Sequence, residues 1–113
     1  MIRLTPSDLT GSVHDGLLDA VHDRWFDLEA VRYQPDAGEF ALRFGDRKTG
    51  PFDHELRIHG VADYRVDDRA HIQVYDLNEI VFDQEKRRIL LRSAFPLEIA
   101  LSVSEDWELL CDT

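Results

Sequence analysis

The sequence predicts an α+β fold in which one N-terminal helix packs on a twisted, mainly antiparallel sheet of about seven strands. Apolar residues repeat with the helical period in one segment only, residues 12–25, and the period changes to two after Trp25. Helical segments do not alternate with strands, which argues against a parallel βαβ sheet. The length fits a single domain spanning residues 1–113. An all-β half-barrel is the alternative fold.

The N-terminal part is predicted to contain a short helical turn at residues 5–8, which Gly11 stops, and then a helix over residues 12–25. Ser12 is a suitable N-cap, with Asp15 three residues later in a variant of the capping box. At 100° per residue, an arc of roughly 160° holds all the apolar side chains of the segment. These are Val13, Leu17, Leu18, Ala20, Val21 and Trp25.

Two kinds of polar residue stand out on this predicted helix. His14 falls inside the apolar arc, so we expect a core or boundary residue with a hydrogen-bond partner. Asp15, Asp19 and Asp23 repeat every four residues on the opposite side, where they form an acidic stripe.

The middle of the chain alternates between apolar and polar residues, as half-buried strands do. Residues 28–34 and 39–45 flank a Pro-Asp-Ala-Gly turn and predict a hairpin. Two further strands are predicted at residues 54–60 and 62–66. A strand over residues 70–76 follows, with Ile72 and Val74 facing inward.

The C-terminal part predicts a second hairpin and the most regular strand. Residues 78–84 and 88–95 flank a three-residue connection suited to a hairpin. Residues 97–103 show the clearest period of two, and residues 107–111 are predicted to add a short strand. The core face of the regular strand is expected to be Leu97, Ile99, Leu101 and Val103.

Charge excludes some classes of partner. The chain has 13 Lys and Arg against 23 Asp and Glu, a formal net charge of −10. Such a surface repels nucleic acid and anionic membranes and attracts basic proteins. The N-terminus has no apolar signal region and the apolar runs are short, so we expect a cytoplasmic protein. A single cysteine, Cys111, allows no intrachain disulfide.

Catalytic and metal-binding motifs are missing from the sequence. It contains no GxSxG, GxGxxG, GxxxxGK[ST], HExxH or CxxC pattern. His59 and His71 are both predicted on the solvent face, where Glu55 could complete a zinc site if their strands were neighbours. His54 and His59 are five residues apart and would point to opposite faces of one strand. We expect no catalytic residue, no metal and no cofactor.

These observations favour a small, acidic, non-catalytic interaction protein that engages a basic protein through Asp15, Asp19 and Asp23. A toxin-neutralising immunity role is one form of such a function. Two alternatives remain open: a metal-assisted hydrolase using His14, or His59 with His71, and a half-barrel that binds an apolar ligand. A homodimer formed through an exposed sheet edge also remains open.

Overall fold

The computed structural model describes residues 1–9 and 11–112, without the side chains of Ser12 and Val13. The N-terminal elements are β1 (Ile2–Leu4), the 3-10 turn η1 (Pro6–Asp8), α1 (Ser12–Val21), β2 (Arg24–Asp27), the 3-10 turn η2 (Leu28–Ala30), β3 (Arg32–Gln34) and β4 (Glu39–Gly45). The C-terminal elements are β5 (His54–Asp68), β6 (Val74–Leu77), β7 (Glu79–Asp83), β8 (Arg88–Arg92) and β9 (Leu97–Asp112).

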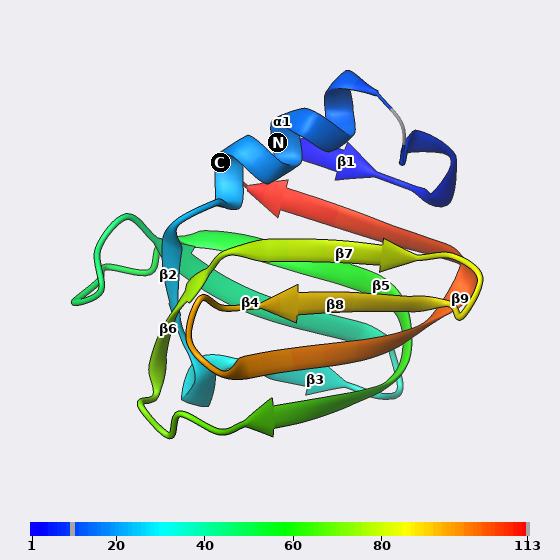
Figure 1. The fold of residues 1–113 in the computed structure, drawn as a ribbon. Coiled ribbons are helices and arrows are strands. Elements are labelled where there is room, and N and C mark those ends of the chain that lie inside the picture. The colour runs from blue at the N-terminus through cyan, green and yellow to red at the C-terminus, as the bar shows by residue number, and fades with distance from the viewer. Residues whose placement is uncertain (10, 113) are drawn as a thin grey trace.

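The strands form a curled antiparallel sheet in the order β6-β2-β4-β5-β9-β8-β7 (Figure 1). The two outermost strands, β6 and β7, are consecutive in the chain and are joined through Asn78. The amide of Asn78 donates to the carbonyl of Arg92 over 2.9 Å, which ties this corner to β8. For residues 1–9 and 11–112, the prediction of a mainly antiparallel sheet with one helix is confirmed, and the curl is consistent with the half-barrel alternative.

Both chain ends lie at the same end of the sheet. β1 pairs with the C-terminal part of β9, with Ile2 opposite Cys111 and Leu4 opposite Leu109. The helix α1 lies beside β1 (Figure 1). The apolar side of α1 therefore turns towards the sheet, where Leu17 and Val21 join the core.

The inner face of the curled sheet is filled by large side chains. Phe26, Phe40, Phe44 and Tyr75 are fully buried there, together with aliphatic residues of every long strand. The predicted core residues of the C-terminal strand, Leu97, Ile99, Leu101 and Val103, are all buried. Their alternation continues in phase through Trp107, Leu109 and Cys111, so the two predicted strands form one continuous β9.

The predicted helix over residues 12–25 is too long. α1 ends at Val21, where the amide of His22 donates to the carbonyl of Leu18. Asp23 then adopts a left-handed conformation, with φ of 63°, and its amide donates to Leu77 of β6. Trp25, which the helical wheel placed on the apolar arc, is instead a strand residue, because it pairs with β4 and β6.

Three predicted strands differ from the observed ones in the middle of the chain. Residues 28–30 form η2 instead of continuing a strand, because the Asp27 carboxylate accepts the amide of Glu29 and caps the turn. Of the predicted strand 28–34, only the part that forms β3 pairs with β4 in the predicted hairpin. The predicted strands 54–60 and 62–66 are one strand, β5, which bends at Gly60.

The prediction for the strand over residues 70–76 assigned the wrong residues to its buried face. Ile72 is exposed, whereas Tyr75 and Leu77 are buried, because β6 begins only at Val74. His71 and Gln73 are both left-handed, with φ of 55° and 72°, and they reverse the chain before the strand. A hydrogen bond from the Tyr75 hydroxyl to the Asp68 carboxylate fixes this reversal.

Replacing Ile99 tests the core assignment of β9. Ile99 is fully buried, so Ile99→Ala should lower the free energy of unfolding by about 2–5 kcal/mol. Ser102 on the same strand is exposed, and Ser102→Ala should change it by less than about 0.5 kcal/mol. Urea unfolding of both variants measures the difference. Similar losses in both would contradict the assignment of the two faces.

The Asp68–Tyr75 contact predicts a pH dependence. Hydrogen bonds from the Tyr75 hydroxyl and the His71 amide hold the pKa of Asp68 below its ordinary value of 3.8. A lowered folded-state pKa stabilises the folded protein at pH values above the ordinary pKa of 3.8. This stability is lost as the pH falls through the folded-state pKa. In Asp68→Asn this loss should be absent, so unfolding stability should fall less on acidification.

Asp63→Asn, which removes an exposed carboxylate from the same strand, is the matched control and should follow the parent protein. Thermal unfolding from neutral to acidic pH measures all three proteins. Parallel curves for Asp68→Asn and the parent would show that Asp68 contributes nothing to acid sensitivity.

Candidate functional site

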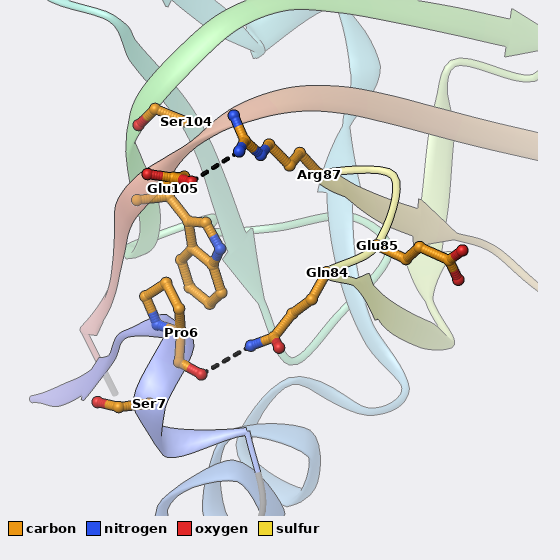
Figure 2. A pocket seen from close by; sticks show the side chains of 8 residues that line it. Pro6, Ser7, Gln84, Glu85, Arg87, Ser104 and Glu105 are labelled. Carbon is orange, nitrogen blue, oxygen red and sulfur yellow. Dashed lines mark hydrogen bonds and ion pairs between the residues drawn. The ribbon is translucent and has the colours of Figure 1, made fainter.

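A hollow of about 540 Å³ lies where η1, the turn between β7 and β8, and the bend of β9 meet (Figure 2). Its lining residues are Pro6, Ser7, Gln84, Glu85, Arg87, Ser104, Glu105 and Trp107. Its volume is in the range of small-ligand sites, which is roughly 300–1,000 Å³. The hollow therefore joins three segments that are far apart in the sequence.

An irregular pairing of β5 with β9 creates this site. His59 lies opposite Glu108, but the next pair is Val61 with Val103, so residues 104–107 bulge out opposite Gly60. Gly60 has a φ of 84°, and a Cβ at that position would lie 2.6 Å from the Ser104 Oγ. Only glycine therefore lets the bulge approach so closely, and the bulge directs its side chains towards the hollow.

An aromatic chain connects the hollow to α1. Trp107 is 4% exposed, and its ring stacks on Phe82 with centroids 5.4 Å apart and an interplanar angle of 12°. His14 of α1 also contacts Phe82, edge to face, with ring centroids 5.6 Å apart. His14 is half-buried, as expected for a boundary residue, and its Nδ1 lies 3.6 Å from the Asp15 Oδ1.

Polar contacts hold the rim of the hollow in place. The Arg87 Nη2 lies 2.7 Å from the Glu105 Oε1, and the Gln84 Nε2 donates to the Pro6 carbonyl over 2.7 Å (Figure 2). The Ser104 hydroxyl donates to the Asp106 carboxylate over 2.7 Å. The lining thus contains two carboxylates and one guanidinium, and that guanidinium is already paired.

The sequence-based reasoning did not identify this site. Its only local signal is the polar triplet Ser104-Glu105-Asp106, which interrupts an otherwise regular apolar alternation in β9. Such an interruption indicates a bulge but does not reveal which segments meet there.

The three aspartates predicted to bind a partner do not form one helical stripe. Asp15 and Asp19 are exposed on α1, as predicted. Asp23 is exposed but lies beyond the end of the helix, in the left-handed turn before β2. The correction follows from the earlier end of α1, since Asp23 loses the four-residue helical spacing.

The segment from residue 4 to residue 23, which includes η1 and α1, has acidic side chains but no lysine or arginine. It contains four aspartates. One of them, Asp8, accepts the backbone amide and the hydroxyl of Thr5, and these hydrogen bonds lower its pKa. The carboxylates of this segment therefore have no cationic side chain within their own part of the chain.

Arginines elsewhere are mostly neutralised by nearby carboxylates. Arg92, for example, lies between Glu98 and Glu79, with N–O distances of 2.7 and 2.9 Å, and these contacts raise its pKa. Among the residues that the structure describes, eight of the eleven arginines are in such pairs: Arg3, Arg24, Arg43, Arg57, Arg69, Arg87, Arg88 and Arg92.

The histidines considered as zinc ligands are not brought together. His59 lies in β5, with its Nδ1 4.0 Å from Glu39, whereas His71 lies beyond the other end of the strand, 3.9 Å from Asp68. Nine residue steps along the strand, a path of about 30 Å, separate His59 from Asp68. Within residues 1–9 and 11–112, no group of three or more His, Cys, Asp or Glu side chains is arranged to hold a metal ion.

The thiol of Cys111, which lies opposite Ile2 of β1 in the sheet, is buried in the core. Burial, with a smaller contribution from the charge of Asp112, raises its pKa to about 11. The thiol therefore remains protonated at neutral pH, in a form that is a poor nucleophile.

Comparisons with known proteins bear on the fold alone. No family model matches the chain, and no curated protein matches it significantly. Among solved structures, it is similar to the crystal structure of an uncharacterized protein from Neisseria gonorrhoeae. The two share 13% identity with a TM-score of 0.45, over 78% of this chain and 90% of the other. In the part of the chain that is described, no helix is long and apolar enough to cross a membrane.

Replacing Gly60 tests the origin of the hollow. Gly60→Ala should lower the free energy of unfolding by about 1–3 kcal/mol, because alanine is strained at this φ and its Cβ would meet Ser104. A Cβ at Gly16 of α1 would meet no neighbouring atom within 4 Å, so Gly16→Ala should stabilise the protein by about 0.5–1 kcal/mol. Urea unfolding distinguishes the two. A neutral Gly60→Ala would contradict the requirement for glycine at the bend.

Proposed function

We propose that this is a non-catalytic interaction protein of the cytoplasm that binds a basic protein through an acidic surface formed by Asp15, Asp19 and Asp23. A toxin-neutralising immunity role is one form that this function would take. The partner would approach the end of the sheet that carries α1, and association would depend on long-range attraction.

The distribution of charge supports this proposal. Four aspartates lie between residues 4 and 23 without a lysine or arginine among them. Eight arginines are paired with carboxylates on other segments, chiefly strands and their turns. The segment around α1 therefore carries negative charge that no lysine or arginine of its own compensates, and a cationic partner would be attracted there.

The two alternatives have less support. An apolar-ligand site would need an internal cavity, but Phe26, Phe40, Phe44 and Tyr75 fill the inner face of the sheet. A metal-assisted hydrolase would need convergent ligands, but His59 and His71 lie near opposite parts of β5. No specific observation favours either function over binding of a basic protein.

A charge-neutralising double variant tests the proposal. Proteins captured from the source lysate are identified, and those with an isoelectric point above about 9 are produced for kinetic measurements. Asp19→Asn with Asp23→Asn should slow their association and reduce its salt dependence, because exposed charges attract over roughly 8 Å at physiological ionic strength. Asparagine also tolerates the left-handed conformation of residue 23, so the fold should be retained.

A second double variant, Glu29→Gln with Asp36→Asn, is the matched control. It changes the formal net charge by the same amount, from −10 to −8, at exposed positions in η2 and in the turn before β4. Association should be slower only when the charges near α1 are removed. Equal rates for the parent and the first variant, or equal slowing by both variants, would contradict the proposed surface.

A further inference from the structure

We propose that the hollow beside η1 binds an arginine side chain of the partner, with Glu105 and Gln84 accepting its N–H groups. This inference rests on the proposed function, because it assumes that the partner is basic. It assigns a specific chemical contact to a site separate from Asp15, Asp19 and Asp23, at the end of the aromatic chain that lies away from α1.

The charges of the hollow favour a cation. Glu105 and Glu85 line it, and the single lining guanidinium, that of Arg87, is held 2.7 Å from the Glu105 Oε1. Figure 2 shows the carboxylate of Glu85 pointing away from Glu105, across the turn. We therefore assign the direct contact to Glu105 and only longer-range attraction to Glu85.

The acceptors of the hollow match the shape of a guanidinium. Arg87 is paired with one oxygen of Glu105, and the second oxygen, Oε2, can accept from an incoming donor. Gln84 donates its amide N–H to the Pro6 carbonyl, so its Oε1 is left as an acceptor. A planar guanidinium has five donors in a fork and can reach two acceptors at once, whereas an ammonium group is a compact point charge.

The remaining surface suits the apolar stem of the same side chain. The Pro6 and Trp107 rings line the hollow together with the polar groups. Arginine buries its methylene groups along apolar surface while its charged end makes polar contacts. Phe82 supports the Trp107 ring from one face, so this part of the hollow is already in place before a partner binds.

Peptide binding to the isolated protein tests the inference without the natural partner. The probes are two capped pentapeptides with four glycines around a central arginine or citrulline, since citrulline keeps the shape and removes the charge. The readout is the NMR signal of the Trp107 indole N–H. The Trp25 indole, which lies under Lys48 away from the hollow lining, is the internal control.

The arginine peptide should shift the Trp107 signal saturably, and the citrulline peptide should shift it much less. Glu105→Gln should weaken arginine-peptide binding by about two- to fivefold, the usual effect of losing one exposed ion pair. Asp36→Asn, which removes an exposed carboxylate elsewhere, should leave binding unchanged. Equal shifts with both peptides, parallel shifts of both indoles, or unaltered binding to Glu105→Gln would each overturn the arginine site.

The outcome is separable from that of the proposed function. If the peptide fails to bind while removal of the charges at Asp19 and Asp23 still slows association of a basic partner, the proposed function stands without this contact. If the peptide binds as expected but no basic partner responds to those charges, the hollow is an arginine site and the surface around α1 is not the docking surface.

Discussion

The close approach of Gly60 to the bulge of β9 is the constraint on which the shape of the molecule depends. Residues 104–107 have a single residue opposite them, so β5 and β9 bend at the same level. The part of β9 that precedes the bulge pairs with β8, and the part that follows it pairs with β1. One irregular position thus allows β9 to pair with two neighbouring strands and places the N-terminal segment against the sheet. It also turns Ser104, Glu105 and Trp107 towards the same hollow.

The ion pairs on the outside of the sheet affect the distribution of surface charge more than they affect stability. Arg57, for example, lies near both Glu39 on β4 and Glu55 on its own strand. Exposed pairs of this kind stabilise a fold by little, about 0–1 kcal/mol each. They do, however, cancel charge locally. In a chain with ten more carboxylates than cations, the carboxylates outside arginine pairs determine the acidic character of the surface, and four of them lie in residues 4–23.

The sequence predicts those parts of the fold that local patterns determine. Strand β4 has the bounds that its alternation predicts, and the core residues of β9 are those with the clearest period of two. The errors occur where contacts distant in sequence decide the conformation. The pairing of β2 with β6 ends α1 before Asp23, and the Asp68–Tyr75 hydrogen bond shifts the inward face of β6 by one residue. The hollow could not be predicted for the same reason, because its three segments meet only through the register of β5 with β9.

The aromatic chain from His14 through Phe82 to Trp107 gives the two proposed contact surfaces a common support. His14 belongs to the helix that carries Asp15 and Asp19, and Trp107 lines the hollow, so one residue of each supporting element contacts Phe82. Side chains held by such packing lose little further freedom when a partner binds. The exposed carboxylates would then provide attraction at long range, whereas the supported hollow would provide a fixed position for one cationic side chain. Charge alone attracts any basic protein, so selectivity between basic partners has to come from a contact of the second kind.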